Sequence, residues 1–226
     1  MRPFIGLILA AYLSLTVTAA DPVKSTELLN GKDLSGWKVI HKDAKADGTK
    51  TWTMKDDVLI CTGKPTGCLA TVAEHENYTL KLKWRYAPTD LKRPNSGVLI
   101  HAQGDDAFWP HSYEAQLAHG QAGDLWLQQN AERKLPTLTM DSSRKDAANK
   151  EGRRYFRIGR DDRIEKPLGD WNDYEITANG DALLLKINGI TVNEASMCSL
   201  TKGRIALQAE GAEIHFRDIT LTPFPR

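Results

Sequence analysis

Side chains able to do chemistry are concentrated in residues 95–128, which read NSGVLIHAQGDDAFWPHSYEAQLAHGQAGDLWLQ. The segment has the composition of β-strands, yet it carries His101, Glu114, Gln116 and Asp124. Imidazole and carboxyl groups can move a proton, and a side-chain amide can hold a hydroxyl group through its paired donor and acceptor. These residue types therefore indicate a site that binds a polar ligand and transfers a proton on it.

Side-chain alternation predicts which of these groups converge, because successive residues of a strand point to opposite faces of a sheet. In NSGVLIHAQ, SYEAQLA and GRIALQAEG one face of each segment is apolar and the other is polar. The polar faces carry Asn95, His101, Glu114, Gln116, Gln208 and Glu210. A solvent face usually carries Lys, Thr and Glu in no particular order, whereas a sugar-binding face is rich in amides and carboxylates. We therefore expect one functional face across three strands, and an ordinary solvent face is the alternative.

Three tryptophans, Trp109, Trp126 and Trp171, lie near these segments. An indole ring can stack on a sugar ring, but a single tryptophan more often packs in a hydrophobic core. We take Trp109 and Trp126 as candidates for sugar contact.

The elements that must position these groups read as short strands. Runs such as TWTMKDDVLIC and YTLKLKWRYA are rich in strand-forming residues, and such runs end at Gly, Asn, Asp or Pro. Asn179-Gly180 and Asn188-Gly189 are placed where two tight hairpin turns need positive φ. Long helical periodicity is absent. The sequence predicts an all-β, two-sheet sandwich.

Residues 140–163 differ from the rest of the chain in being polar, charged and short of apolar side chains. They include a basic cluster made up of Arg153, Arg154, Arg157, Arg160 and Arg163. Acidic neighbours dilute this positive charge, so we interpret the segment as a solvated surface loop rather than a nucleic-acid patch.

The start of the chain has the layout of a cleavable secretory signal. An apolar run over residues 4–17 is followed by the small-residue end TVTAA. The run is shorter than the roughly 20 residues that a spanning helix needs. We predict a signal peptide over 1–20, a single domain over 21–226 with no further membrane span, and a secreted or periplasmic location.

Net charge and cysteine content bound the function further. The 30 basic and 29 acidic side chains give no general attraction to nucleic acid or anionic lipid. Export permits disulfides, and the three cysteines Cys61, Cys68 and Cys198 allow at most one bridge within the chain. Three buried free thiols are the alternative, and the sequence does not choose the pairing.

At the level of whole segments, the chain resembles the 3-keto-disaccharide hydrolase family. The resemblance rests on LLNGKDLSGWKV (28–39), NSGVLIH, WPHSYEAQL and GRIALQAEGAEIHFRDITLTPF, and it covers nearly all of the chain after residue 20. It implies a two-sheet jelly roll of the concanavalin-like lectin and glucanase type, with the site on the concave face. It also implies a small carbohydrate substrate that carries a ketone at C3.

A C3 ketone acidifies the hydrogen on C2, next to the carbon that bears the leaving group, so elimination through an enolate becomes available. That route needs a base at C2, an acid for the leaving oxygen, and donors or a cation at the oxyanion. His101 and Glu114 are the candidate acid–base pair, with the assignment of base and acid open. The groups expected to hold the sugar are Arg85, Asn95, Trp109, Gln116, Asp124, Trp126, Lys166, Gln208 and Glu210. Among these, Arg85 or Lys166 would bring positive charge to the enolate.

Two questions stay open at this stage. No metal-binding spacing stands out in the sequence, although a divalent cation bridging the 3-keto and 2-hydroxyl oxygens would be chemically sensible. A lectin-like module that binds a glycan without cleaving it is the competing function. The ionisable pair His101 and Glu114 favours an enzyme, because binding alone needs only amides and aromatic rings.

Overall fold

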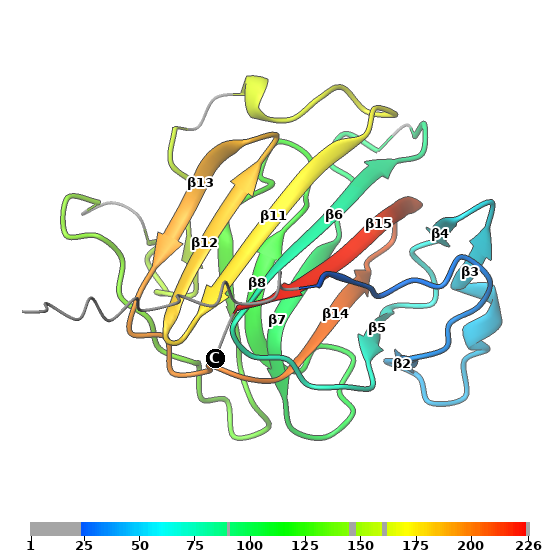
Figure 1. Ribbon diagram of the computed structural model, residues 1–226, viewed down its shortest axis with the longest axis horizontal. Coiled ribbons are helices and arrows are strands. Elements are labelled where there is room, and N and C mark those ends of the chain that lie inside the picture. Colours follow the sequence, from blue (N-terminus) through cyan, green and yellow to red (C-terminus); the bar gives the residue numbers. More distant parts are fainter. Residues whose placement is uncertain (1–23, 90, 145–147, 160–161, 225–226) are drawn as a thin grey trace, which may run out of the picture.

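Two stacked antiparallel β-sheets make up the part of the chain that the computed structural model describes, residues 24–89, 91–144, 148–159 and 162–224 (Figure 1). The first sheet, named here the β6 sheet, has the strand order β13 (Ile190–Ala195), β12 (Ala182–Ile187), β11 (Asn172–Asn179), β6 (Tyr78–Tyr86), β15 (Ile214–Pro223), β4 (Val58–Cys61) and β3 (Trp52–Lys55), and β1 (Thr26–Glu27) pairs with β15. The predicted signal sequence lies outside the described residues.

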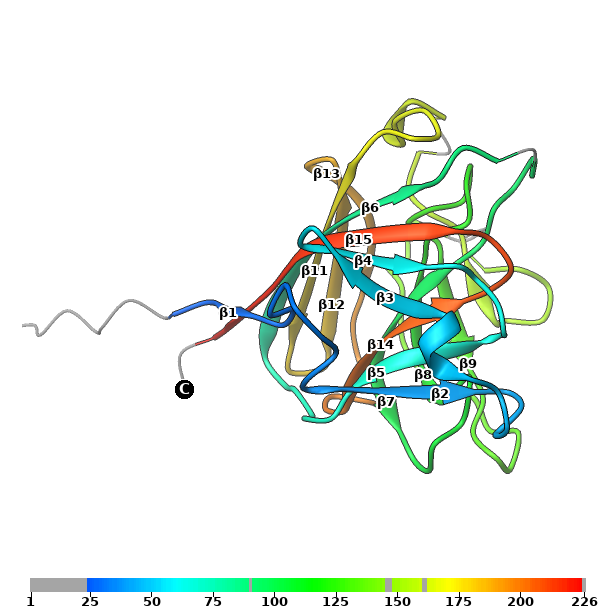
Figure 2. The same ribbon diagram turned by 90° about the vertical axis from the view of Figure 1, so that its right-hand side faces the viewer.

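The second sheet, named here the β7 sheet, has the order β10 (Arg154–Tyr155), β9 (Leu125–Gln128), β8 (His111–Gln116), β7 (Gly97–Gln103), β14 (Arg204–Ala209), β5 (Gly67–Thr71) and β2 (Trp37–His41). The side view in Figure 2 shows the two layers, with β15, β4 and β3 above β14, β5 and β2. Two short 3-10 helices, Gly48–Lys50 and Asp162–Ile164, complete the described elements. This arrangement confirms the predicted two-sheet sandwich.

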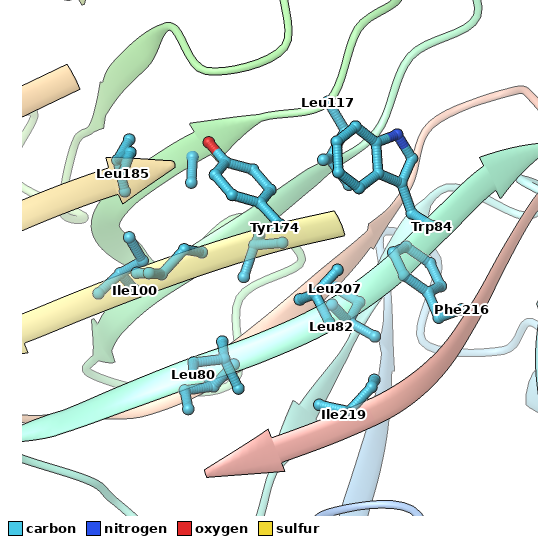
Figure 3. Packing of buried hydrophobic residues seen from close by; sticks show 14 of the residues in the cluster. Leu80, Leu82, Trp84, Ile100, Leu117, Tyr174, Leu185, Leu207, Phe216 and Ile219 are labelled. Carbon is cyan, nitrogen blue, oxygen red and sulfur yellow. The ribbon is translucent and has the colours of Figure 1, made fainter. Parts of the chain in front are cut away.

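Strict alternation explains why these segments form strands with one buried face. In β6, YTLKLKWRY, the side chains Tyr78, Leu80, Leu82, Trp84 and Tyr86 are buried, and the residues between them are more exposed. Figure 3 shows how residues of the β6 sheet pack against residues of the β7 sheet in the space between the layers. Burial of each such large apolar side chain stabilises the fold by roughly 1.5–3 kcal/mol.

The hairpins confirm one predicted turn and shift the other by a residue. Ile187 pairs with Ile190, so Asn188-Gly189 forms a two-residue turn with positive φ at both positions. Asn179, in contrast, pairs with Ala182, so the first turn consists of Gly180-Asp181.

A second, smaller apolar cluster lies on the outer face of the β7 sheet, away from the main core. It consists of Ile40, Cys68, Ala70, Leu99, Ala102 and Ala206, and Trp109 packs against it. This packing occupies the outer face at β2, β5, β14 and part of β7. The polar groups predicted on the same face therefore lie beside an apolar cluster that Trp109 covers.

All three cysteines are free and buried. Cys61 and Cys198 belong to the main core, whereas Cys68 lies in the outer cluster. Burial raises the pKa of Cys61 and Cys68 to about 12, so both remain thiols. Of the two possibilities that the sequence left open, a single bridge or three buried thiols, the structure has three buried thiols.

Residues 140–163 are tied to the fold more closely than the sequence predicted. Arg154 and Tyr155 form the edge strand β10, which pairs with β9. Arg157 is only 5% exposed and makes an ion pair with buried Glu165. The interpretation as a solvated loop is wrong for this part of the segment, and Arg160 lies outside the described residues. Within the described parts of the chain, no helix has the length and hydropathy that crossing a bilayer requires.

Candidate active site

Glu114 is a buried carboxyl group on the outer face of the β7 sheet, and its pKa is strongly raised. It lies in β8 opposite Leu99 of β7 and Trp126 of β9, and it is 4% exposed. Its neighbours Tyr113 and Ala115 point into the main core, which confirms the predicted alternation of this strand. The Gln128 side-chain amide donates to one carboxylate oxygen, and Gln208 also hydrogen-bonds the carboxylate.

The environment of Glu114 favours its protonated form. Burial, and next the negative charge of Glu210, raise its pKa to about 7, against the opposing effects of Gln128, Gln208 and Arg153. A carboxyl group with this pKa exchanges a proton readily near neutral pH, which suits a general base or acid.

A glycine allows these side chains to converge. A Cβ atom placed on Gly97 would lie 2.4 Å from the Gln208 Oε1 atom and 2.8 Å from the Glu114 Oε1 atom. Any side chain at this position would therefore displace both groups. Gly97 in β7 creates the space in which Glu114 and Gln208 meet.

A second carboxyl group lies close to the first. Glu210 follows β14 directly, and its side chain hydrogen-bonds Asn95. Burial raises the pKa of Glu210, and the hydrogen bond from Asn95 acts against that effect. The predicted convergence of Asn95, Glu114, Gln208 and Glu210 is thus present in the structure.

A groove of about 680 Å³ opens beside this cluster. Its walls come from the loop after β7, including Phe108 and Trp109, and from the loop after β9, including Arg133. Gln128 and Arg153 also line the groove, and Gln128 hydrogen-bonds Glu114. Gln128 thus connects the groove wall to Glu114, and the volume of the groove suits a small ligand.

Buried polar atoms gather around Glu114 and the groove without hydrogen-bond partners among the described residues. They are Asn95 Oδ1, Trp109 Nε1, Trp126 Nε1, Arg153 Nε and Gln208 Oε1. A buried polar atom left without a partner costs about 1–3 kcal/mol. Donors and acceptors distributed between the groove wall and the neighbours of Glu114 match the needs of a ligand that carries both hydroxyl and carbonyl groups.

His101 lies on the opposite side of the sheet from Glu114. The pairing of β7 with β8 shifts between Ile100 and Gln103, and His101 has a φ of 53°. Its ring lies 5.7 Å from the ring of Tyr78, a core residue of the β6 sheet, and its Nδ1 atom is 2.9 Å from the Leu200 carbonyl oxygen. The interpretation that His101 and Glu114 share a face is wrong, because this β-bulge adds a residue and reverses the alternation.

Arg85 and Lys166 do not lie at the site either. The Arg85 guanidinium, in β6, lies 4.6 Å from the centre of the Trp171 ring and is within hydrogen-bonding distance of His215, all on the outer side of the β6 sheet. The Lys166 amine donates to the Trp171 carbonyl oxygen. Arg85 points out of the core, but its strand belongs to the other sheet from Glu114.

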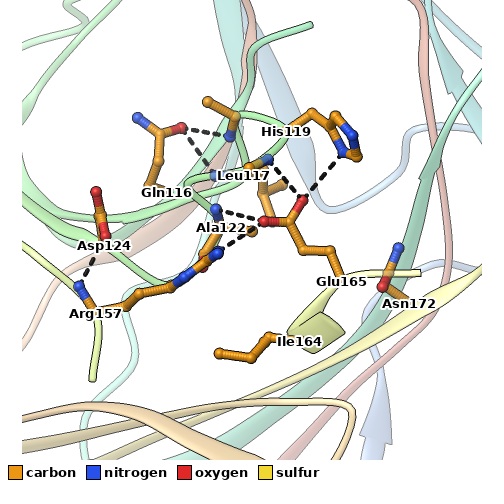
Figure 4. A network of polar contacts seen from close by, with 12 residues as sticks. Gln116, Leu117, His119, Ala122, Asp124, Arg157, Ile164, Glu165 and Asn172 are labelled. Carbon is orange, nitrogen blue, oxygen red and sulfur yellow. Dashed lines mark hydrogen bonds and ion pairs between the residues drawn. The ribbon is translucent and has the colours of Figure 1, made fainter. Parts of the chain in front are cut away.

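Asp124 and Gln116 are occupied by contacts within the protein. Asp124 accepts from Arg154 Nε at 2.7 Å and from the Arg157 backbone N–H at 2.8 Å. The amide oxygen of Gln116 accepts from the Leu117 and Ala118 backbone N–H groups. Figure 4 shows both contacts beside the buried carboxylate of Glu165, which is paired with Arg157. Both carboxylate oxygens of Asp124 are therefore engaged within the protein, where they secure residues 154–157.

Trp126 keeps a place at the site. It lies opposite Glu114 in the strand pairing, and the Arg154 guanidinium lies 5.4 Å from its ring centre. Trp109 lines the groove while it packs on the outer apolar cluster. Trp126 and Trp109 therefore both pack against other residues of the protein and also border the candidate site.

The sequence interpretation missed Gln128, Gly97 and Arg153. Gln128 could have been found, because alternation in GDLWLQ places it on the same face as Trp126. Arg153 could not have been found in this way. Its position depends on the pairing of the neighbouring strand β10 with β9, and the sequence around β10 does not look like a strand. Within the described residues, no three His, Cys, Asp or Glu side chains come together as a metal-binding group.

The fold has solved relatives of low sequence identity. One is a protein from Parabacteroides distasonis whose assignment as a glycosyl hydrolase is provisional, with 21% identity, 89% of this chain and 100% of that chain covered, and a TM-score of 0.61. A carbohydrate-binding module from Bacillus subtilis has 12% identity, 83% and 95% coverage, and a TM-score of 0.57. A β-glucanase from Bacillus licheniformis has 8% identity, 92% and 100% coverage, and a TM-score of 0.53. These likenesses establish the jelly-roll fold of concanavalin-like proteins.

Among curated proteins, no relative matches the chain. The model of one protein family does match, from residue 24 to residue 222, and its description is the 3-keto-alpha-glucoside-1,2-lyase-like domain. This match begins before β1 and ends one residue before the end of β15, and it includes Glu114, Gln208 and Glu210. The resemblance seen in the sequence is confirmed, and the chain belongs to the family of 3-keto-alpha-glucoside-1,2-lyase-like domains.

Proposed function

We propose that this protein cleaves the glycosidic bond of 3-keto glycosides by elimination, with Glu114 as the base that removes the proton on C2. The observation that carries the proposal is a buried carboxyl group with a pKa of about 7, whose partner Gln128 lines a groove together with Trp109 and Arg153, both of which have a buried polar atom without a hydrogen-bond partner. Membership of a family described by 3-keto-glucoside lyase chemistry supports the same substrate class.

The reaction proceeds in two electron shifts. Glu114 takes the C2 proton, the C–H electrons form a double bond between C2 and C3, and the carbonyl π electrons move onto the C3 oxygen. The enolate then returns its electrons to re-form the ketone, a double bond forms between C1 and C2, and the C1–O bond breaks. The leaving oxygen takes up a proton, so that one proton is removed and one is delivered. The products are an unsaturated 3-keto sugar and a free alcohol.

The surrounding groups match this sequence of steps. Gln208 and Asn95 each present an unpartnered amide oxygen that can accept from a sugar hydroxyl. Trp109 presents an unpartnered N–H on the groove wall, and its ring can stack on the sugar or on the leaving group. Glu210, whose pKa is also raised by burial, is the second group able to exchange a proton.

The test uses a panel of chemically prepared 3-keto glycosides and their unoxidised parents. Purified protein should release the alcohol from the 3-keto compounds and leave the parents intact, because only the ketone acidifies C2. Substrate deuterated at C2 should react more slowly if proton removal limits the rate. Tight binding of the panel without release of alcohol would contradict the proposal and favour a lectin-like binding module.

We also propose that the protein is exported and functions outside the cytoplasm, on the basis of the signal layout of residues 1–20. Expression of the whole gene product with its own first residues, followed by mass measurement of the exported chain, tests this. A chain that begins near Asp21 is expected. Retention of Met1 in an unexported product would contradict it.

A further inference from the structure

Among the described residues, no carboxylate forms an ion pair with Arg153, which lies on the groove wall. Arg153 lines the groove, its Nε atom is buried without a hydrogen-bond partner, and its charge acts on Glu114. We propose that Arg153 binds the C3 oxygen of the substrate and stabilises the negative charge that develops there during proton removal. This inference rests on the proposed function and assigns the oxyanion-binding residue of that site.

The backbone holds Arg153 in place from both sides. Its N–H donates to the Asn149 side-chain oxygen at 2.9 Å, and its carbonyl oxygen accepts from the Leu127 N–H at 2.8 Å. The next residue, Arg154, is paired with buried Asp124. Three residues further, Arg157 is paired with Glu165. A guanidinium on a backbone fixed in this way is preorganised, which oxyanion stabilisation requires.

Several other arginines of the described chain have evident side-chain partners, unlike Arg153. Arg204 is paired with Asp106, and Arg144 donates to Asn193. Arg85 and Arg217 both lie over the Trp171 ring. No ion pair or side-chain hydrogen bond within the described residues accounts for the guanidinium of Arg153, although its Nε atom is buried.

The position of Arg153 also fits the chemistry of the enolate. A guanidinium stays protonated throughout, so it can donate hydrogen bonds to the C3 oxygen without competing with Glu114 for the C2 proton. It is also the cation that acts on Glu114, opposing the effect of burial on the pKa of that carboxyl group. Arg153 therefore stabilises both the deprotonated form of Glu114 and the enolate that forms when Glu114 removes the C2 proton.

The experiment compares Arg153→Gln and Arg153→Lys with the control Arg217→Gln. Arg217 lies over the Trp171 ring on the outer face of the β6 sheet, away from the groove, and its Nε atom is also buried without a hydrogen-bond partner. With a 3-keto glycoside, Arg153→Gln should lower kcat by about 100-fold, the usual scale for losing one preorganised oxyanion contact, while KM changes little. Arg153→Lys should lose about 10-fold, because it keeps the charge but not the fork of donors. Arg217→Gln should stay within about 2-fold of the unaltered protein.

Further readouts separate a catalytic role from a structural one. Guanidinium ion added to Arg153→Gln should restore part of the rate, and the pH at which the rate is half-maximal should rise, since a charge that lowers the pKa of Glu114 is gone. If Arg153→Gln does not fold, Arg153→Lys decides the question, and a rate equal to that of the unaltered protein would overturn the inference. Wild-type kcat in folded Arg153→Gln would overturn it as well.

Failure of the proposed function gives a different result. If the unaltered protein cleaves none of the 3-keto glycosides, the proposed function is wrong and the role of Arg153 falls with it. If the unaltered protein cleaves them and Arg153→Gln behaves like Arg217→Gln, only the assignment of Arg153 is overturned.

Discussion

The outer faces of the two sheets both carry carboxyl groups, but in opposite electrostatic settings. On the β6 sheet, Glu175 makes ion pairs with Lys81 at 3.1 Å and Lys186 at 3.5 Å beneath a hollow of about 330 Å³. Burial raises the pKa of Glu175, yet the two lysines outweigh that effect and the pKa lies below its ordinary value. On the β7 sheet, Glu114 has amide partners and a carboxyl neighbour, and its pKa rises to about 7.

Burial alone does not explain this difference. The side chain of Glu165 is as deeply buried as that of Glu114, but Arg157 pairs with it at 2.7 Å and two backbone N–H groups donate to it. Charge on a carboxylate is stabilised where a cation is in contact, and such a group serves the fold. A buried carboxylate whose only direct partners are neutral amides is available to exchange a proton, and we infer that this distinguishes the functional face from the structural one.

The largest effect is expected from breaking the buried pair. Arg157→Met should lower the free energy of unfolding by about 3–5 kcal/mol, because it leaves the charge of Glu165 buried without its cation. Urea denaturation followed by tryptophan fluorescence would measure it. A loss below about 1 kcal/mol would mean that Glu165 is solvated, and the contrast with Glu114 would lose its basis.

The next effect concerns turnover. Glu114→Gln should lower kcat on a 3-keto glycoside by about 100-fold or more, since the amide cannot take up the C2 proton, and Glu175→Gln should leave kcat within about 2-fold. In the unaltered protein the rate should rise with pH and level off above the pKa of Glu114, near 7, because only the carboxylate acts as a base. Equal rates in the two variants would show that neither face carries the base.

The same substitution should act on stability in the opposite direction. The folded protein holds the Glu114 proton more tightly than the unfolded chain does, so stability falls as pH rises from about 4.5 to about 7. Glu114→Gln removes this penalty and should stabilise the protein by roughly 2–3 kcal/mol at pH 8, with little change at pH 4. Thermal unfolding at the two pH values measures the difference. A variant that is less stable than the unaltered protein at pH 8 would contradict the raised pKa.

The smallest effect is expected on the outer face of the β6 sheet. Lys81→Ala removes one partner of Glu175, and both side chains are partly exposed, so the loss should be below about 1 kcal/mol and should shrink in high salt. Denaturation at low and high ionic strength would measure it. A loss as large as that of Arg157→Met would mean that the two faces do not differ in the way described.

Strand alternation predicted much of the site, and local irregularities account for its errors. Regular strands kept the alternation, so Glu114 and Gln208 were placed on the correct face. His101 was misplaced because the β-bulge that moves it inward depends on pairing with two neighbours, β8 and β14. Short-range patterns do not reveal such an extra residue.

The remaining errors concern which sheet a strand joins and which charges pair. Arg85 has the outward alternation of a site residue, but nothing within β6 indicates that the strand belongs to the other sheet. Arg153 is held by contacts of its neighbours with Asp124, which lies 29 residues earlier in the chain. The position of such a polar segment is decided by partners that lie far away in the sequence. The composition of the segment itself does not reveal it.

The groove walls and the proposed base come from different kinds of segment, loops and paired strands. This separation affects how the protein could diversify in evolution. The loops after β7 and β9 line the groove, whereas Glu114 and Gln208 lie within paired strands. Insertions and deletions are tolerated in surface loops far better than in paired strands. Changes in loop length could therefore alter the shape of the groove, and with it the range of ligands, while the strands that carry the proposed base stay the same.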